Sequence, residues 1–462
     1  MNGLNASPFL QRRLSYESPH SEPLLSEHNP DTLIRRKEEV WSFLNIAFPT
    51  ILSCIMELLP NTLAVAFVGQ FCTKEELDGA SLGTMFSNVV GLSLGLGFTS
   101  ALDMMGSHAH GAGNTKLIGV YLQRMFMLLC CMFVPICFLN WYTSDILIAL
   151  GQPKDVSLLA GRFTKYMLPS IFLIWMYDIM RKALQIQGRV KPMVFIALFS
   201  NSLSILLCYT MLKYSSMGYV SAALARSLAA ASLPVLMLIY LRVTKVYREF
   251  WGGFSMKEAF SGWYEMCKVG LPGMFAVCLE WWAFEIMALI CGLTDDPNTA
   301  IGANAILLQT TSLLYMIYLG ISIATNVRVG VSFGANDPAR AKLAAKIGMG
   351  CALVSSSVLG LLLFVGRYQV AAFYTKDETL RQAIVDSLWL VAMYQLPDSL
   401  KEACSGIFKA SGMQVTAASI IFAAYYLIGL PLGCLFAFGV DLFDDQVTGL
   451  WMVSFNFSFD AL

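Results

Sequence analysis

Long uninterrupted apolar segments constrain the fold of this chain more than any other feature of its sequence. Residues 125–139, 194–212 and 415–438 contain no Asp, Glu, Lys or Arg. The hydrocarbon core of a bilayer is about 30 Å thick, and a helix needs about 20 apolar residues to cross it. The apolar runs are continuous rather than alternating with polar residues, which favours helices over a β-barrel. We therefore expect an all-α polytopic membrane protein.

About twelve segments are long and apolar enough to cross a membrane. Hydrophobic residues make up 56% of the chain and charged residues only 13%, whereas a soluble domain carries about 25% charged residues. The last segment covers only about 24 Å as a helix and contains Asp460, so we expect a final helix that is cut short. The expected spans are residues 41–68, 79–105, 118–142, 156–180, 190–213, 219–241, 264–292, 301–328, 342–366, 383–409, 416–438 and 447–462.

Positive residues between the spans alternate in number from one side of the bundle to the other. Lys and Arg gather before the first span and after the fourth, sixth and eighth spans, whereas residues 294–300 contain none. Because cytosolic loops are rich in Lys and Arg, this pattern predicts a cytosolic N-terminus. Residues 1–38 are polar, and we expect a disordered cytosolic tail there. The sequence leaves open whether the membrane is the plasma membrane or a vacuolar or endolysosomal membrane.

The two halves of the chain repeat short patterns at a constant spacing. Gly79–Ser81 matches Gly302–Asn304, and Gly97–Ala101 matches Gly320–Ala324. Six spans per half is an even number, so both halves enter the membrane from the same side, and a site is expected between them near mid-membrane. The predicted parts are an N-lobe, a cytosolic linker and a C-lobe, at residues 39–241, 242–262 and 263–462.

Two carboxylates lie near the centres of predicted spans. An ionised side chain at mid-bilayer costs about 2.5–3.5 kcal/mol even on insertion scales, so each one needs a role. Glu280 lies near the middle of the seventh span, and no Lys, Arg or His lies within a turn of it. Asp398 is central in the tenth span. A carboxylate in an aqueous cavity is able to exchange a proton for a cation, so both are candidate coupling acids. Glu285 lies about 140° around the helix from Glu280 and need not face the same cavity.

Lys401 complicates the role of Asp398. Residues three apart share a helical face and form ion pairs, and an Asp398 held ionised by Lys401 would act as a fixed orienting charge while Glu280 carries the proton. In the alternative, Lys401 extends to the membrane interface and leaves Asp398 available to protons. Glu402 lies on the same face and is a further candidate.

Other polar and aromatic residues within the spans are candidates for lining a transport path. Glu57 lies one turn before Asn61, and it is either a second cation site or the partner of a distant Arg. Trp281 and Trp282 adjoin Glu280 and are able to stack on a cationic ligand. The eighth span contains four polar side chains, Asn304, Gln309, Tyr315 and Tyr318. Such groups hold helices together more often than they line a transport path.

Other classes of function find little support. The formal net charge of zero argues against a nucleic-acid partner. Twelve cysteines are scattered without a CxxC spacing, so neither a disulfide framework nor a zinc site is expected. We expect no cofactor, no metal site and no enzymatic activity.

Several motifs together resemble the eukaryotic branch of the multidrug and toxic compound extrusion (MATE) family. Cys278–Glu285 resembles that branch's seventh-helix motif CLEWWxFE. Ala101–Arg124 and Val327–Asn336 resemble its segments ALDTLCxQAYGAG…GxYxQR and VRVxNxLGAGxP. Gly406–Gln414 resembles GVxRGxGxQ, and counting back from it places Asp398 at the family's tenth-helix acidic position.

The resemblance covers about residues 39–455 and implies two six-helix lobes around a V-shaped cavity. It implies an antiporter, acting as a monomer, that exports organic cations, other xenobiotics or secondary metabolites in exchange for protons. It also implies that Glu280, Glu285 and Asp398 are the coupling and cation-binding acids. A Na⁺-coupled exporter and a lipid or metabolite flippase of related architecture stay open as alternatives, although a flippase favours a more basic cavity.

The chain departs from the family pattern at three internal positions. Lys401 stands where the family usually has a neutral residue, so we expect it to alter Asp398 or the preferred charge of the substrate. Tyr318 occupies a position that is often Pro, and Glu57 replaces a Gln or an apolar residue.

Overall fold

The structure is a computed structural model that describes residues 30–439 and 447–452. Within these ranges all regular secondary structure is helical, as the continuous apolar runs predicted. The chain divides into two units, residues 1–42 and 43–462. Of the first unit, residues 30–42 are described and are helical, so helix α2 begins at Pro30 rather than at the predicted residue 41. The predicted disordered tail, residues 1–38, is therefore wrong for residues 30–38, which continue the helix, while residues 1–29 lie outside the described residues.

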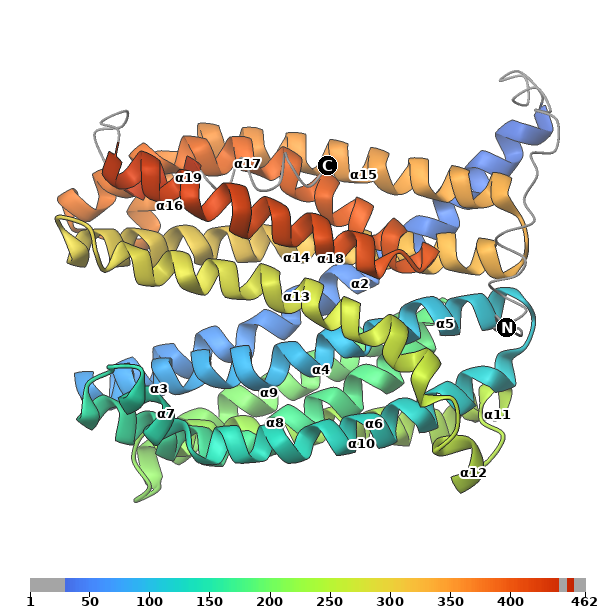
Figure 1. The fold of residues 1–462 in the computed structure, drawn as a ribbon, viewed down its shortest axis with the longest axis horizontal. Coiled ribbons are helices and arrows are strands. Elements are labelled where there is room, and N and C mark those ends of the chain that lie inside the picture. Colours follow the sequence, from blue (N-terminus) through green and yellow to red (C-terminus); the bar gives the residue numbers. More distant parts are fainter. Residues whose placement is uncertain (1–29, 440–446, 453–462) are drawn as a thin grey trace, which may run out of the picture. The chain divides into compact units, whose positions relative to one another are not determined.

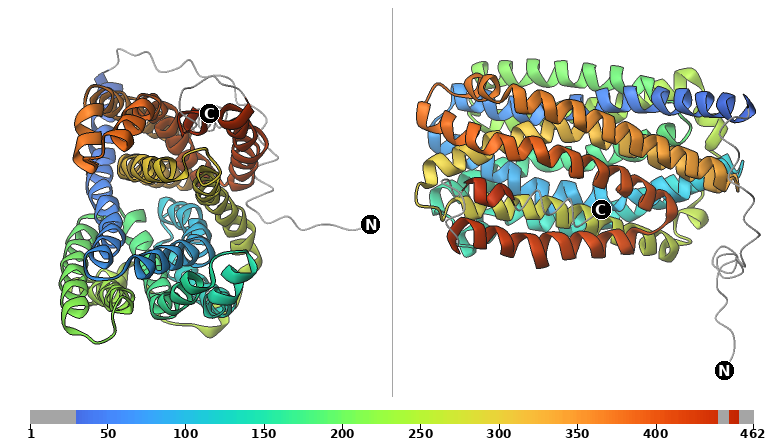
Figure 2. Two further views of the ribbon diagram at one scale, coloured as in Figure 1. Left: turned by 90° about the vertical axis from the view of Figure 1, so that its left-hand side faces the viewer. Right: turned by 90° about the horizontal axis from the view of Figure 1, so that it is seen from above.

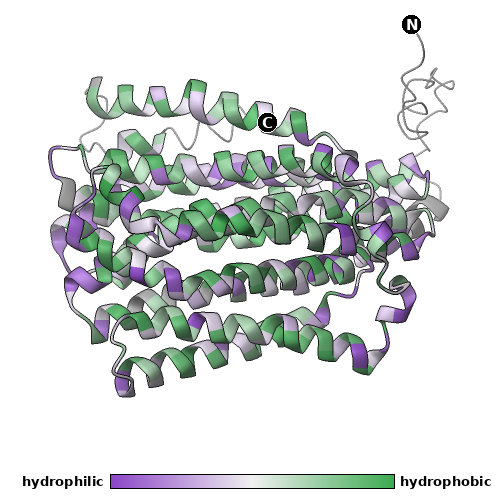
Figure 3. Cartoon of the chain, turned by 60° about the horizontal axis from the view of Figure 1, so that its bottom comes forward, coloured by the Kyte–Doolittle hydropathy of each residue, from purple (hydrophilic) through white to green (hydrophobic). Residues whose placement is uncertain are grey.

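The helices of the second unit run roughly parallel, with apolar residues along most of their length and polar residues gathered towards their ends (Figures 1 and 3). Helices α3 to α5 follow one another without a loop and form one spanning segment, Lys74–Gly111. The elements of the first half are α2 (Pro30–Phe71), α3 (Lys74–Ser87), the π-helix η1 (Asn88–Leu92), α4 (Ser93–Phe98), α5 (Ser100–Gly111), α6 (Thr115–Trp141), α7 (Thr143–Ala149), α8 (Lys154–Ile186), α9 (Lys191–Tyr214) and α10 (Val220–Thr244).

The second half of the chain follows a linker that contains two short helices. Long helices again dominate, and the last of the described stretches is broken by π-helical turns. The linker helices are α11 (Tyr247–Phe250) and α12 (Met256–Ala259). The elements of the second half are α13 (Trp263–Cys291), α14 (Pro297–Gly334), α15 (Pro338–Val365), α16 (Arg367–Tyr374), α17 (Glu378–Ser411), α18 (Gln414–Phe422), η2 (Ala423–Gly429), α19 (Leu430–Cys434) and η3 (Leu435–Gly439).

Nine segments among the described residues are long and apolar enough to cross a membrane. Two further long helices, α8 and α17, coincide with the predicted fourth and tenth spans but are not among these nine. Both helices nevertheless carry charged residues inside the protein, because Asp178 on α8 and Asp398 and Glu402 on α17 are buried. Of the predicted twelfth span only residues 447–452 are described, and the predicted shortening of that helix lies outside the described residues.

Matching glycines confirm the internal repeat. The orange and red helices of the second half group together, apart from the cyan and green helices of the first (Figure 2). A methyl group added at Gly97 would lie 2.6 Å from the Cα of Met274, and one added at Gly320 would lie 2.8 Å from the Cα of Ile51. In both pairs the two partners are related by the same shift of 223 residues. The two halves therefore pack against each other through equivalent close approaches of their backbones.

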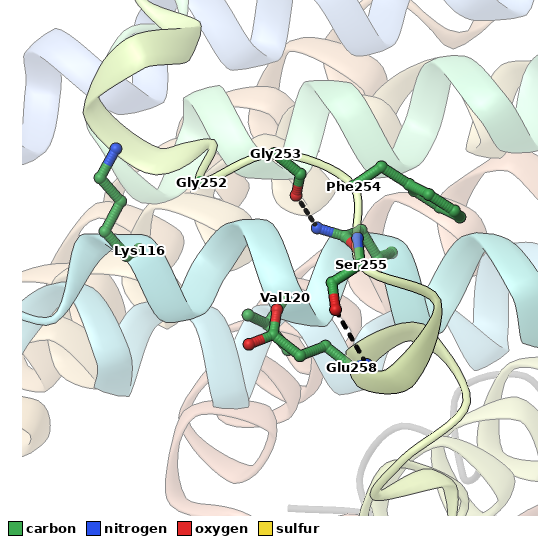
Figure 4. Close-up of a pocket in the computed structure, with 8 residues that line it drawn as sticks. Lys116, Val120, Gly252, Gly253, Phe254, Ser255 and Glu258 are labelled. Carbon is green, nitrogen blue, oxygen red and sulfur yellow. Dashed lines mark hydrogen bonds between the residues drawn. The ribbon is translucent and has the colours of Figure 1, made fainter.

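The linker is fixed to helix α6 by hydrogen bonds. The side-chain amide of Gln123 donates to the carbonyl of Gly253 over 2.7 Å and accepts from the amide of Ser255 over 2.9 Å. Lys116 Nζ donates to the carbonyl of Arg248 over 2.7 Å. A cavity of about 320 Å³ lies between the linker and α6 (Figure 4). The linker thus belongs structurally to the first half of the chain.

Candidate functional site

Three charged side chains meet inside the second half of the chain, and we call Glu280, Asp398 and Lys401 the C-lobe triad. Lys401 Nζ lies 2.5 Å from Glu280 Oε1 and 3.0 Å from Asp398 Oδ1. The side chain of Lys401 is 6% exposed, that of Asp398 is 2% exposed, and that of Glu280 is 12% exposed. Two carboxylates share one ammonium, so the fully ionised triad carries a net charge of −1.

Helices α13 and α17 bring the triad together. Asp398 and Lys401 are three residues apart on α17 and therefore share one face of that helix. Their predicted ion pair is confirmed, and the alternative in which Lys401 extends to the membrane interface is wrong, because the side chain is buried. Glu280 reaches the same ammonium from α13. Sequence reasoning missed this partner, because the 121 residues between Glu280 and Lys401 leave no local signal.

Tyrosine side chains surround the ammonium of Lys401. Its Nζ lies 5.9 Å from the ring centroid of Tyr315 and 5.8 Å from that of Tyr425, which is within the range of cation–π attraction. Lys401 Nζ also donates to the hydroxyl of Tyr425 over 3.3 Å. The hydroxyl of Tyr394 donates to Asp398 Oδ1 over 3.0 Å. Carboxylates and aromatic faces together make an environment that is suited to a cation.

Sequence reasoning did not single out Tyr394 or Tyr425. Tyr394 lies one turn before Asp398 on α17, so helical spacing was an available signal. Tyr425 lies in the π-helical turn η2, and such turns occur frequently at functional sites. That irregularity was not visible in the apolar pattern of residues 416–438.

Glu402 forms a second buried acidic group beside the triad. Its Oε1 lies 3.8 Å from Lys409 Nζ, and its Oε2 accepts a long hydrogen bond of 3.5 Å from the hydroxyl of Tyr315. Tyr315 therefore contacts both the ammonium of Lys401 and the carboxylate of Glu402. The predicted position of Tyr315 and Glu402 beside the path of a cation is consistent with this geometry.

Glu285 does not join the triad. It is half-buried on α13, and among the described residues no hydrogen bond or ion pair involves its carboxylate. The three acids singled out by the resemblance are therefore divided by the structure. Glu280 and Asp398 converge on Lys401, whereas the described residues show no such contact for Glu285, and its role as a coupling acid stays a prediction.

The first half of the chain contains a related cluster, and we call Glu57, Asp178 and Arg181 the N-lobe triad. Arg181 forms ion pairs with Glu57 Oε1 through Nη1 and with Asp178 Oδ1 through Nη2, the latter over 2.5 Å. Asp178 Oδ2 accepts from the hydroxyl of Thr99 over 2.6 Å. The interpretation of Glu57 as the partner of a distant Arg is therefore confirmed. Asp178 was missed, although it is a charged residue within a predicted span.

Comparisons with known proteins identify the family. A family model described as MatE matches residues 49–210 and 272–435. This chain belongs to the MATE family. Multidrug and toxin extrusion protein 1 of Danio rerio is 30% identical over 423 residues, which are 92% of this chain and 70% of that protein. Protein DETOXIFICATION 16 of Arabidopsis thaliana is 32% identical over 416 residues, which are 90% of this chain and 85% of that protein.

Solved structures of MATE transporters share the fold. The crystal structure of the eukaryotic MATE transporter AtDTX14 is 26% identical, covers 92% of this chain and 94% of that one, and superimposes with a TM-score of 0.86. A Vibrio cholerae MATE transporter, VcmN, is 16% identical with a TM-score of 0.81 over 93% of this chain and 95% of that one, and it shows the fold alone. The chain is therefore an integral multi-pass membrane transporter, and its relatives are extrusion proteins rather than enzymes.

The remaining candidate residues of this MATE transporter have mixed outcomes. Asn304 and Tyr318 hold helices together, as expected for polar groups on the eighth span. Asn304 Oδ1 accepts a hydrogen bond from Trp451 Nε1 over 3.1 Å, and the hydroxyl of Tyr318 donates one to Gln395 over 3.0 Å. Trp282 Nε1 donates to the carbonyl of Val89 over 3.4 Å, which joins α13 to η1. Trp281 and Gln309 are half-buried, and a role for them in lining the path stays a prediction. The side chain of Asn61 lies outside the described residues, so its role also stays a prediction.

Proposed function

We propose that this chain is a secondary active antiporter that exports organic cations in exchange for protons, with other xenobiotics or secondary metabolites as further cargo. The C-lobe triad carries this proposal. Its two carboxylates and one ammonium leave a net charge of −1 inside a membrane protein, where an uncompensated charge is costly. A bound monovalent cation or a proton would neutralise this charge. The buried tyrosines favour a cation that has an organic or otherwise weakly hydrated character.

Competition for Glu280 explains the coupling. Lys401 has two carboxylate partners, and the one on its own helix, Asp398, is also held by Tyr394. When a substrate cation approaches Glu280, Lys401 is able to stay with Asp398. A proton on Glu280 removes the charge that holds the cation and releases it. Because proton and cation cannot occupy Glu280 together, the movement of one is linked to the opposite movement of the other.

Asp398 acts in this scheme as a fixed orienting charge. It is buried, paired with Lys401 and hydrogen-bonded to Tyr394, so its carboxylate has little freedom to exchange partners. Glu402 and Lys409 form a separate pair that neutralises itself. The proposal therefore assigns the exchanged proton to Glu280, with Glu285 as a second acid at a distance from the triad.

Transport into inside-out vesicles tests the function and the coupling ion. Purified protein is reconstituted, and uptake of a fluorescent monovalent organic cation is followed with either a pH gradient or a Na⁺ gradient imposed alone. The proposal predicts uptake that follows the pH gradient and persists without Na⁺. Uptake that requires Na⁺ would replace the proton with the alternative coupling ion, and translocation of a labelled lipid without cation uptake would favour the flippase.

A further inference from the structure

The N-lobe triad occupies the position in the repeat that corresponds to the C-lobe triad. Glu57 precedes Glu280 by 223 residues, the same spacing that separates Gly97 from Gly320. On α8, Asp178 precedes its counterpart Asp398 on α17 by 220 residues, and Arg181 precedes Lys401 by the same number. In each half, a glutamate on the first long helix meets an arginine or lysine that is three residues after an aspartate. The similarity therefore includes both the sequence positions and the ion-pair geometry.

The two triads have the same charge but differ in their access to solvent. One guanidinium lies between two carboxylates in the N-lobe triad, which gives a net charge of −1 when all three are ionised. The side chain of Glu57 is 35% exposed, whereas that of Arg181 is 12% exposed and that of Asp178 is 2% exposed. The nearby pair of Lys182 and Asp103, with 2.6 Å between Nζ and Oδ2, neutralises itself. The uncompensated charge is therefore most accessible at Glu57.

Two buried polar atoms beside the triad have no hydrogen-bond partner among the described residues. One is the hydroxyl oxygen of Tyr177, a residue that is 2% exposed, and the other is Nε of Arg181. The ring of Tyr177 lies against the guanidinium, with 5.9 Å from Cζ to the ring centroid. A buried polar group without a partner is unfavourable, because it has lost its hydrogen bonds to water. Both atoms are available for a hydrogen bond with a further polar group.

We propose that the N-lobe triad is a second binding site for a monovalent organic cation, in which Glu57 binds the ligand and Arg181 is the tethered cation that the ligand displaces. The ligand class rests on the proposed function. Arg181 already has a second partner in Asp178 on its own helix, so it keeps an ion pair when Glu57 is released. One positive charge on the ligand restores neutrality to the triad, and the ring of Tyr177 gives the displaced guanidinium of Arg181 an aromatic face to rest on.

Equilibrium binding to the full-length protein separates this site from the C-lobe triad. The ligand is radiolabelled tetraphenylphosphonium, and the protein is held in lipid nanodiscs. A Glu280→Gln background removes the charge of the C-lobe triad that binds cations. In that background, the double variant Asp178→Asn/Arg181→Gln removes the tethered cation together with its buried counter-charge, which avoids leaving a lone buried ion. We expect the Kd to fall by about fivefold, because Glu57 no longer has an internal competitor.

Glu57→Gln provides the opposite change. Added to the same background, it should abolish the remaining saturable binding, whereas Glu75→Gln, which neutralises an exposed glutamate on α3, should leave the Kd unchanged. An unaltered Kd in both the double variant and Glu57→Gln, with loss of thermal stability alone, would show a purely structural ion pair and overturn the proposal. If Glu280→Gln by itself leaves both transport and binding intact, the proposed function fails, while the comparison between the N-lobe variants still decides this inference.

Discussion

Lys401 shows how far single residues can be interpreted from sequence and where that interpretation stops. Helical spacing predicted its ion pair with Asp398, because three residues on one helix fix the relative direction of two side chains. The same reasoning found no partner for Glu280, since it considered only residues within a turn. The partner came from α17, which the chain brings to α13 only after folding. Local pairs were predictable, and pairs between helices were not.

Removal of the tethered ammonium should strengthen cation binding. Lys401→Gln leaves Glu280 without its internal competitor, so we expect the apparent affinity for a monovalent organic cation to rise about fivefold, together with lower thermal stability from two unpaired buried carboxylates. Competition binding on purified protein measures the affinity. Lys376→Gln, which changes an exposed lysine in the loop before α17, is the control. Weaker binding by Lys401→Gln would mean that Lys401 supports the cation site rather than competes for it.

At the scale of elements, the positions of α8 and α17 were predicted correctly, but hydropathy alone does not explain why their charged residues are tolerated. Both were expected as spans from their apolar stretches, and both are present as long helices. Neither is among the nine described segments that are long and apolar enough to count as spans by composition. Arg181 and Lys182 on α8, and Lys401 on α17, are each paired with a carboxylate on another helix, which offsets the cost of placing these charges inside the bundle. Sequence hydropathy does not include that pairing, so it underestimates the helices that carry the candidate sites.

Close packing between α5 and α14 gives a prediction at the same scale. A methyl group at Gly111 would overlap with the carbonyl of Val331, and one at Gly334 would overlap with the carbonyl of His108. Overpacking of this kind costs about 1–3 kcal/mol, so Gly111→Ala and Gly334→Ala should each lower the thermal unfolding temperature. Gly350→Ala, where nothing lies within 4 Å of the added methyl group, should not. Equal stability of all three variants would contradict the close approach of these helices.

For the whole molecule, the repeat was predictable from glycines, while the relation between the two triads was not. Glycine patterns keep a constant spacing because the backbones of the two halves approach each other at equivalent points. The triads differ in their cation, Arg in one and Lys in the other, and α8 and α17 are offset by three residues relative to the glycine repeat. A search for identical motifs therefore passes over them, and only the positions of the side chains reveal the correspondence.

The predicted orientation in the membrane belongs to this scale as well. The alternation of Lys and Arg predicts that the N-terminus and the linker are cytosolic. In a variant without native thiols, an impermeant thiol reagent applied to sealed cells should label Ser216→Cys, between α9 and α10, and should not label Lys257→Cys, in the linker. Both positions are exposed in the structure. Labelling of Lys257→Cys alone would reverse the topology and the direction of export.

The central claim is that Glu280 carries the exchange between proton and cation. Its most direct test is the uptake of a fluorescent organic cation, driven by a pH gradient, into vesicles that contain Glu280→Gln. We expect uptake at the level of protein-free vesicles with normal membrane insertion, because a neutral amide neither binds the cation nor accepts the proton. Glu378→Gln, an exposed acid at the start of α17, should transport like the unaltered protein. Undiminished, pH-driven uptake by Glu280→Gln would contradict the account.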